Sequence, residues 1–387
     1  MIRSIHILLL CVLPIFSFAE QWNKKANFGG VGRHRALGIS IGNKGYIGLG
    51  HVNGTGIDIS YNDWWQFDPA SNSWTQKANY PTVNHGAVGF GTSTKGYVGG
   101  GSYLNGEFFC YDPQLNTWTP IAPCPTTPGD VQCFSIQNKG YVIFGNLLYE
   151  YLPFSNTWTA KANCPVNVTS WSSSFATNSS GFVKTLSSLY EYKPSLDTWV
   201  QRAYFPGLMS GGAAAFECND KGYFVCGYSG ALSTVTDEVW EFNPGNNTWT
   251  PIEQFPGTSR RFPVAFSIND IGYFGTGTNG INMNDFWSFD PSLFGLGIDE
   301  SNGANISVTS YPNPFTEELT IAIESSSTLN TGDLNYEIFS LTGSSVLKGQ
   351  ITGSMTKVNT AALPAGSYIY SINGAGKQIK NGQLIKR

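Results

Sequence analysis

Short apolar runs alternate with polar turns along most of the chain, and one arrangement of them recurs. Between residues 63 and 81 an aromatic run leads into Asp68-Pro69, a polar turn follows, and Trp74 opens a second run. A recurrence at one offset indicates an internal repeat. In four further segments the tryptophan again stands five residues after the proline: Tyr111-Asp112-Pro113 with Trp118, Tyr151-Leu152-Pro153 with Trp158, Tyr192-Lys193-Pro194 with Trp199, and Phe242-Asn243-Pro244 with Trp249.

A second marker, a Gly-Tyr or Gly-Phe pair, runs in step with the tryptophans. Each pair follows a short apolar strand, such as residues 37–41. We expect the glycine to lie in a hairpin turn that needs a positive φ, and the aromatic residue to begin a buried strand. Each period of about 40–50 residues then contains four strands, which is typical of a propeller blade. The six glycines are Gly45, Gly96, Gly140, Gly181, Gly222 and Gly272.

The sixth repeat is divided between the two ends of this region. Residues 285–291 supply its aromatic third strand, but no tryptophan follows, because position 296 is Leu296. The missing strand stands near the start of the chain, where residues 22–28 match residues 74–80 without strands of their own before them. We expect this N-terminal strand to complete the sixth blade, since closing the ring removes exposed sheet edges. The prediction is an all-β chain with a six-bladed propeller over residues 20–292.

The glycine runs, the spaced tyrosines and tryptophans and the proline at the end of each blade resemble the kelch repeat. The resemblance covers roughly residues 20–292, and the double glycine is clearest in the second blade, at Gly99-Gly100-Gly101. It implies a kelch-type β-propeller.

Composition agrees with a β-rich protein and excludes one class of partner. Charged residues make up 12% and aromatic residues 14% of the chain, which has 45 glycines. The net charge is −4, and no basic stripe of the kind that nucleic-acid binding requires is present.

The N-terminus predicts export. Residues 1–19 combine Arg3, an apolar core and a small-x-small cleavage site ending at Ala19, which is the pattern of a signal peptide. The apolar run is too short to span a bilayer, and we predict no transmembrane segment. Six cysteines follow the leader, and an exported protein could pair them in many ways. Buried free thiols are the simpler interpretation, because cysteine packs like a small apolar residue.

After a predicted linker at 293–304, residues 305–387 change in character and predict a small antiparallel β-sandwich. Tyr311-Pro312-Asn313-Pro314-Phe315, then Thr342-Gly343, then the Pro364-to-Tyr368 segment and a short basic end follow in order. This order resembles the C-terminal sorting domain of type IX secretion. The resemblance implies the type IX export machinery as a partner, passage through the periplasm, and a secreted or cell-surface product from which this domain is usually removed.

Arginine, histidine and aromatic residues gather in the loops that lead into the inner strands. These loops share one face of a propeller with the loops between second and third strands, and such loops commonly carry function. Ring closure brings the sixth blade beside the first, so the face gains a sector rich in Arg and His. Arginine matches carboxylates bidentately, which favours an acidic sugar or an acidic peptide side chain as ligand. Trp171, Tyr103 and Tyr61 could stack on sugar rings. The candidate ligand-binding residues are Arg33, His34, Arg35, His51, His85, Trp171, Arg260 and Arg261.

Simpler roles compete with this hypothesis. Arg33 and Arg260 could tie neighbouring blades together through backbone carbonyls, and the histidines could be solvated loop residues. No tight histidine spacing supports a metal site, so we predict neither metal nor cofactor. The acids that precede proline, Asp68, Asp112 and Asp290, fit ordinary turn chemistry.

The chain has no serine-hydrolase motif, no phosphate-binding loop and no zinc-protease motif. We therefore predict a binding or adhesion module for a protein or glycan ligand. The kelch family includes a copper oxidase of galactose, but blades three to six carry no histidine for such a site. The alternative is a sugar-processing enzyme resembling the six-bladed sialic acid mutarotase/epimerase, for which Glu107 or Asp130 could supply an acid.

Overall fold

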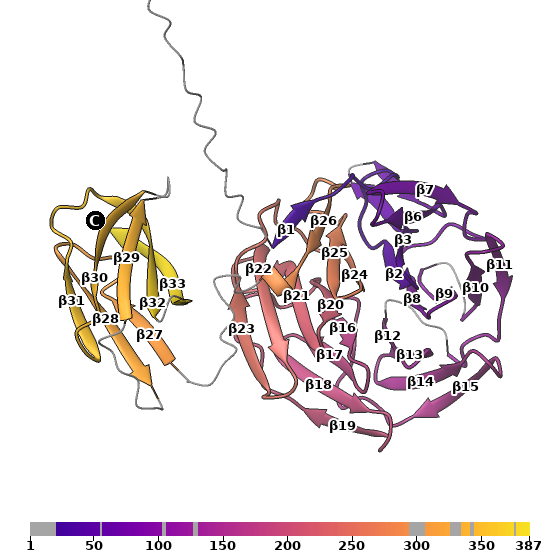
Figure 1. Cartoon of the computed structure of the whole chain (residues 1–387). Coiled ribbons are helices and arrows are strands. Elements are labelled where there is room, and N and C mark those ends of the chain that lie inside the picture. Colours follow the sequence, from indigo (N-terminus) through magenta and orange to yellow (C-terminus); the bar gives the residue numbers. More distant parts are fainter. Residues whose placement is uncertain are drawn as a thin grey trace, which may run out of the picture. The chain divides into compact units, whose positions relative to one another are not determined.

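The computed structural model describes residues 21–54, 56–102, 106–126, 131–293, 306–325, 334–340, 344–374 and 377–387. The predicted leader and almost all of the predicted linker lie outside these residues. The chain divides into two compact units between Pro291 and Ser292. The first unit is a ring of sheets and the second a pair of stacked sheets, and each is described by itself (Figure 1).

The first unit is a six-bladed β-propeller, as predicted. Six four-stranded antiparallel sheets surround a central axis, and Figure 1 shows the first strand of each sheet nearest the centre. From the inner to the outer strand, the first three blades are β2 (Leu37–Ile41), β3 (Lys44–Gly48), β6 (Trp64–Asp68) and β7 (Ser73–Lys77); β8 (Val88–Gly91), β9 (Gly96–Gly99), β10 (Phe108–Asp112) and β11 (Thr117–Pro120); and β12 (Gln132–Ile136), β13 (Lys139–Phe144), β14 (Leu147–Leu152) and β15 (Thr157–Lys161).

The remaining blades follow the same order. They are β16 (Ser173–Ala176), β17 (Gly181–Thr185), β18 (Ser188–Lys193) and β19 (Thr198–Gln201); β20 (Ala214–Cys218), β21 (Lys221–Ser229), β22 (Thr234–Asn243) and β23 (Thr248–Ile252); and β24 (Val264–Ile268), β25 (Ile271–Gly275), β26 (Phe286–Phe289) and β1 (Trp22–Lys24). The short hairpin β4 (His51–Gly54) and β5 (Ile57–Ser60) is inserted in blade 1, and a 3-10 turn, η1 (Pro291–Leu293), follows β26.

Strand β1 supplies the outer strand of the sixth blade. It pairs antiparallel with β26, where Trp22 stands opposite Phe289 and Lys24 opposite Trp287. The Trp22 side chain is 4% exposed and contacts Phe289 and Phe255 at ring-centroid distances of 4.9 and 5.0 Å. The two ends of the propeller sequence therefore share one sheet.

In blades 1 to 5 the recurrent tryptophan joins its blade to the one before it. Trp118 of blade 2 donates its indole N–H to the Ala78 carbonyl at the end of blade 1, at 2.9 Å. The Ala78 amide in turn donates to the Asn116 side chain at 2.8 Å. The equivalent indole bonds run from Trp74 to Ala26, Trp158 to Ala122, Trp199 to Ala162 and Trp249 to Ala203.

The six glycines of the Gly-Tyr pairs do not have positive φ, so our explanation for them was wrong. The left-handed turn positions are taken by other residues, such as Asn138 in blade 3 and Asp220 in blade 5. Space is the reason for glycine instead. A Cβ on Gly140 would lie 2.0 Å from the Phe90 ring of the preceding blade, and the other five positions meet apolar side chains of the preceding inner strand at 2.1 to 2.8 Å. The small residue lets one blade's core side chain lie flat against the next strand.

The second unit is the predicted β-sandwich. One sheet has the order β27–β28–β31 and the other β30–β29–β32–β33. Side chains such as Phe315, Leu319 and Ile338 fill the core between them and are fully buried. The strands are β27 (Ile306–Tyr311), β28 (Glu318–Ser325), β29 (Leu334–Ser340), β30 (Ser345–Gln350), β31 (Met355–Asn359), β32 (Gly366–Gly374) and β33 (Lys377–Lys386).

Two sequence-based questions are answered for the described residues. The six cysteines of the propeller are free thiols, and four of them are buried. Within the described ranges, the structure has no helix with the length and apolar character that a membrane crossing needs.

Candidate functional site

One face of the propeller is formed by the loops that enter the inner strands, together with the loops between second and third strands. We call it the entry face. A chain of backbone hydrogen bonds links its blades: Gly212 donates to Trp171, Phe262 to Gly212, Arg35 to Phe262, and Gly86 to Arg35, at 2.8 to 3.3 Å. These residues occupy equivalent positions in blades 1, 2, 4, 5 and 6. The loops that carry the candidate side chains are thereby fixed to one another.

The backbone at this position is left-handed in four of these blades. Gly86 and Gly212 have φ of 64° and 65°, which glycine adopts without steric cost. Arg35 and Phe262 have φ of 51° and 53° and carry side chains in the same conformation. A non-glycine residue in this region is of order 1–3 kcal/mol less stable than in an ordinary conformation, and such residues concentrate at functional sites. Arg35 and Phe262 take this conformation despite that cost.

Arg33 is not available to a ligand, because it is wholly buried inside blade 1. Its guanidinium binds both oxygens of Asp63, with one N–O distance of 2.8 Å, and donates to the Leu49 carbonyl at 2.9 Å. The indole N–H of Trp65 donates to the same carboxylate at 2.8 Å. The Tyr61 ring, which we expected to stack on a sugar, lies 3.9 Å from the Arg33 guanidinium.

Arg260 repeats this arrangement in blade 6. It is fully buried, binds both oxygens of Asp285, and donates to the Thr276 carbonyl at 2.9 Å. Burial alone would raise the pKa of Asp285, but the hydrogen bonds and charge of Arg260 outweigh it and lower the pKa below its usual range. Arg33 and Arg260 therefore belong to the scaffold, and their place in the candidate site is corrected on this ground. Their own carbonyls accept from Gly277 and Gly227 of the preceding blades, so the backbone here joins neighbouring blades, whereas the guanidinium groups bind carbonyls of their own blade.

Arg261 has a different environment from its neighbour Arg260. The residue is half-buried, and its guanidinium lies between three aromatic rings, 5.8 Å from Trp171, 5.8 Å from Phe262 and 5.9 Å from Tyr228. It forms no side-chain hydrogen bond or ion pair with the part of the chain that the structure describes. Arg35 lies on the same phenylalanine, with its guanidinium 4.5 Å from the Phe262 ring. Two arginines and three aromatic rings thus form one surface over blades 1, 4, 5 and 6.

The three histidines form a stack next to this surface. The His51 ring lies 4.3 Å from the His34 ring and 3.9 Å from the His85 ring. The Nδ1 atom of His34 is 2.7 Å from the side-chain oxygen of Asn282, and the two nitrogens of His85 lie 3.0 and 2.9 Å from the hydroxyls of Ser60 and Ser102. Histidines from blades 1 and 2 therefore meet. His34 and His51 are not solvated loop residues, because each is only 6% exposed.

The charge of this sector is positive. Burial is the main cause that lowers the pKa of His34, and the hydrogen bond with Asn282 opposes it. The nearby charges of Arg35 and Arg261, and His85, lower the pKa further. His34 is therefore held neutral beside two permanent cations.

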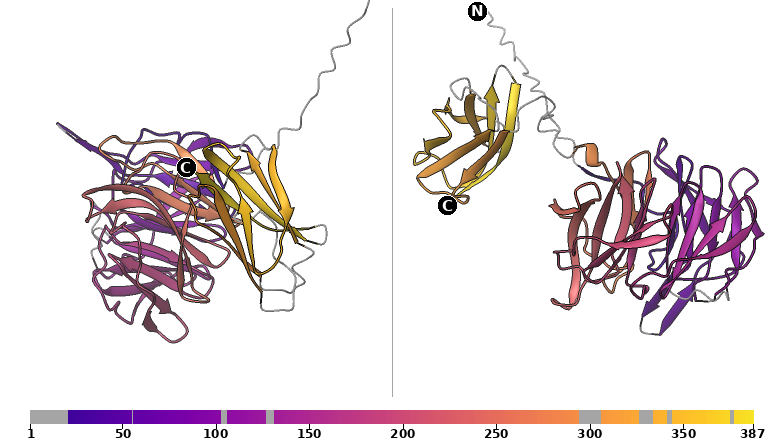
Figure 2. Two further views of the ribbon diagram at one scale, coloured as in Figure 1. Left: turned by 90° about the vertical axis from the view of Figure 1, so that its left-hand side faces the viewer. Right: turned by 90° about the horizontal axis from the view of Figure 1, so that it is seen from below.

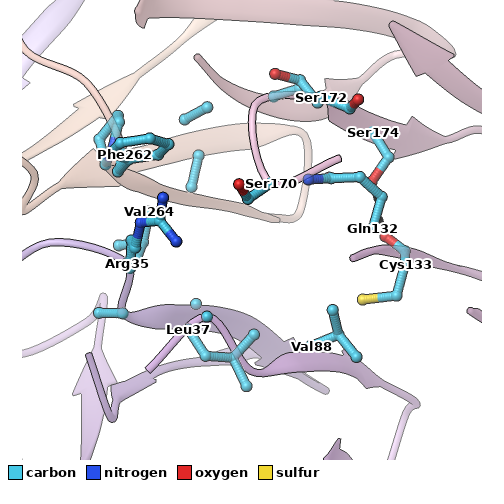
Figure 3. Close-up of a pocket in the computed structure, with 18 of the residues that line it drawn as sticks. Arg35, Leu37, Val88, Gln132, Cys133, Ser170, Ser172, Ser174, Phe262 and Val264 are labelled. Carbon is cyan, nitrogen blue, oxygen red and sulfur yellow. Dashed lines mark hydrogen bonds between the residues drawn. The ribbon is translucent and has the colours of Figure 1, made fainter. Parts of the chain in front are cut away.

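A cavity of about 210 Å³ opens at the centre of the entry face. Figure 3 shows the Arg35 guanidinium pointing into it, with Phe262 alongside and Ser170 and the Gln132 amide across from it. Leu37, Val88 and Val264 form its apolar side. None of its described lining residues is acidic, and Glu107, an exposed residue before β10, is not among them. Tyr103 and Asp130 lie outside the described residues.

A second cavity, of about 270 Å³, lies further along the inner strands and shares Gly89 and Cys133 with the first. Small residues such as Ser40, Ser135 and Ser267 line it, and Glu217 is its single ionisable carboxyl among the described lining residues. Burial, reinforced by the charges of nearby aspartates, raises the pKa of Glu217 to about 7. The two cavities follow the axis of the propeller and differ in charge.

Sequence reasoning missed Asp63 and Asp285, the partners of the buried arginines. A signal for them exists, because the pattern Asn-Asp-x-Trp occurs at 62–65 and 284–287, in the two blades that have the arginine. It also missed Phe262 and Asn282, which contact the arginines and His34 from blade 6. For a metal site, no group of three or more ligand side chains occurs among the described residues.

Two comparisons with known proteins place the chain. The family model of the secretion system C-terminal sorting domain matches residues 309–386, which confirms the sorting domain predicted from sequence. The chain is therefore exported to the cell surface or secreted, and the sorting domain makes the type IX export machinery its partner.

The solved structure of YjhT is similar to the propeller. The match covers 67% of this chain and 95% of that chain, with a TM-score of 0.57 and 15% sequence identity. At this identity the similarity shows the fold alone, a kelch-type propeller. No curated protein matches the chain.

Proposed function

We propose that the propeller is a binding module that recognises an anionic group of a glycan or protein ligand on its entry face. The observation that carries the proposal is the environment of Arg261. Arg260, its neighbour in the chain, has a carboxylate within the protein, whereas Arg261 forms no ion pair with the described residues and is held between aromatic rings at the surface. A guanidinium in this position presents its donors to a carboxylate from outside.

The surroundings of Arg261 suit an acidic sugar or an acidic side chain. Trp171 is 37% exposed, so part of its indole face is accessible to a sugar ring or an apolar group beside the carboxylate. Arg35 adds a second cation at the mouth of the central cavity, where Ser170 and Gln132 offer hydroxyl and amide groups. The combination favours a ligand with both a negative charge and hydrogen-bonding groups.

Exposed aliphatic side chains on the same face favour a large ligand. Ile57, Val83, Leu208, Leu232 and Ile281 stand in entry loops or in loops between second and third strands, and are 43 to 74% exposed. Exposed apolar side chains that gather on one face mark sites of interaction with other macromolecules. A role in adhesion or capture outside the cell agrees with the sorting domain.

The enzymatic alternative needs a carboxyl group beside the arginines. Sugar chemistry without a metal depends on a positioned acid or base within hydrogen-bond reach of the substrate. The cavity at the centre of the entry face has no carboxyl among its described lining residues, and Arg33 is buried against Asp63. The described geometry therefore supports binding better than catalysis.

Binding measurements test the proposal. The exported protein would be screened against acidic and neutral glycans and against acidic peptides, and then compared with the variants Arg261→Gln and Lys25→Gln. Lys25 lies after the outer strand β1 and serves as the matched loss of one charge. We expect Arg261→Gln to weaken binding of the acidic ligand about 10- to 100-fold, the value of one charge-assisted interaction, and Lys25→Gln to leave it unchanged. Equal binding by both variants, or recognition of neutral ligands alone, would reject the site.

A further inference from the structure

The histidine stack connects three separate loops of the entry face. His34 lies in the loop that enters blade 1, His51 begins the β4–β5 hairpin, and His85 lies in the loop that enters blade 2. Their rings follow one another at 4.3 and 3.9 Å, and the last pair is nearly parallel, with an interplanar angle of 18°. The central ring, that of His51, is therefore enclosed by an imidazole on each side.

The contacts of the stack hold the β4–β5 hairpin at its base. The backbones of His34 and His51 exchange two hydrogen bonds, at 3.1 and 3.0 Å, and the His85 ring contacts the hydroxyl of Ser60 on the other strand of the hairpin. Away from this base the hairpin is open to solvent: Ile57 and Ile59 are 50% and 51% exposed. The hairpin projects beyond the blades, in the indigo-to-purple part of the chain (Figure 2).

The charged groups around the stack oppose its protonation, with one exception. Arg35, Arg261 and His85 all lower the pKa of His34. Asp58 is the exception: its carboxylate lies 3.9 Å from Nδ1 of His51, and its side chain is 72% exposed. One proton on His51 has a counter-charge there, whereas a second proton on His34 would place two cations about 4 Å apart, beside Arg35 and Arg261.

We propose that the stack is an acid-sensitive clamp, which holds the β4–β5 hairpin against the entry face at neutral pH and releases it when the histidines become protonated. The groups that set the response are His34, His51, His85, Arg35, Arg261 and Asp58. Because the chain is exported, the pH outside the cell acts on this clamp directly. The clamp does not depend on the ligand proposed above, since it concerns the position of the hairpin alone.

The direction of the effect follows from His34. Its pKa is lowered in the folded protein by burial and by the arginines, so the open or unfolded state binds protons more readily. The closed arrangement is therefore fully stable above the ordinary histidine pKa of about 6.5, and it loses stability as the pH falls below that value. Each proton taken up on opening increases the open fraction by about tenfold per pH unit in this window.

Hydrogen–deuterium exchange of the β4 and β5 amides tests the clamp, with rates corrected for the intrinsic effect of pH. Between pH 7.5 and 5 we expect the open fraction of this hairpin to rise at least about tenfold. The tip of the β21–β22 hairpin in blade 5, which has no histidine, is the internal reference and should not change. An unchanged β4–β5 hairpin, or an equal change in both hairpins, would overturn the proposal.

The variant His34→Phe separates the charge from the stacking. Phenylalanine keeps a flat ring against His51 but cannot take up a proton, so the hairpin should remain protected at pH 5. His85→Phe is the second variant, in case the first does not fold, and it should also reduce the response. Loss of protection at pH 5 in a folded variant, to the extent seen in the unaltered protein, would show that the histidines are not the clamp. Circular dichroism at both pH values monitors folding.

Discussion

Trp118 and Ala78 form a hydrogen bond that crosses from blade 2 to blade 1, from the indole N–H to the carbonyl oxygen at 2.9 Å. Asn116, two residues before the tryptophan, accepts from the amide of the same alanine. Asn116 and Trp118 therefore join the two blades by one accepted and one donated hydrogen bond. The same pair of bonds occurs at Ala26, Ala122, Ala162 and Ala203.

Replacing Asn116 by alanine should weaken this junction. The substitution removes the acceptor of the Ala78 amide and of the Tyr111 hydroxyl, both at 2.8 Å, and puts alanine at a φ of 54°. We expect a loss of about 1–3 kcal/mol in the free energy of unfolding, measured by urea denaturation. Asn116→Asp is the control, because Asp197 makes the equivalent bonds in blade 4. If alanine and aspartate at this position gave the same stability, the side-chain oxygen would not be what joins the blades.

The buried pair Arg33 and Asp63 predicts a second effect on stability. Arg33→Met leaves the carboxylate in a largely buried position without its guanidinium, and also removes the bond to the Leu49 carbonyl. Breaking one side of a buried ion pair is expected to destabilise the propeller by roughly 3–5 kcal/mol. The double variant Arg33→Met/Asp63→Leu should lose clearly less, since no unpaired charge remains.

Ligand binding distinguishes this role from the one first suggested by the sequence. Any folded Arg33 variant should keep the affinity of the entry face, because the side chain is wholly buried. A selective loss of affinity at unchanged stability would instead return Arg33 to the binding site.

Gly140 predicts a steric effect between blades 2 and 3. The Cβ of an alanine there would lie 2.0 Å from the Phe90 ring, which is stacked on Tyr97 at 5.1 Å and cannot withdraw easily. Gly140→Ala should destabilise the protein by about 1–3 kcal/mol, and additional truncation of Phe90 should cost less in this variant than in the unaltered protein. Gly54→Ala is the control, because no atom lies within 4 Å of its added Cβ. Equal melting temperatures for the two glycine variants would contradict the packing argument.

The repeat could be predicted from sequence because residues of the same type recur at the positions where each blade packs against its neighbour. Tryptophan five residues after proline marks the outer strand, and the split sixth copy pointed to Trp22, which lies opposite Phe289. The reason for the blade glycines could not be found this way. A turn glycine and a glycine that makes room for a neighbouring ring look alike until the neighbour is known.

The candidate site was harder to predict than the fold. Position in the repeat placed His34 and His85 on one face, and ring closure placed Arg261 near Arg35. However, two adjacent arginines of one loop have different environments. Arg260 points inward to Asp285, and Arg261 lies against the Trp171 ring. Side-chain direction along such a loop depends on partners from other blades, and a single sequence does not identify those partners.

Glu217 makes the stability of the propeller depend on pH. Burial in the second cavity, with Asp270 and Asp220 nearby, raises its pKa to about 7, although the Asp220 amide donates to it. The folded state therefore holds a proton that the unfolded state releases near its ordinary pKa of about 4.3. This contribution to stability is present below pH 4.3 and is lost as the pH rises to about 7.

Glu217→Gln should remove this loss, because glutamine stays neutral at every pH. The melting temperature of the variant relative to the unaltered protein should rise between pH 4.5 and 8 and then level off, as measured by calorimetry. Glu253→Gln, at an exposed carboxylate beyond β23, is the matched control and should show no such rise. A difference between Glu217→Gln and the unaltered protein that stays constant over the whole pH range would mean that this carboxyl is already ionised in the folded propeller.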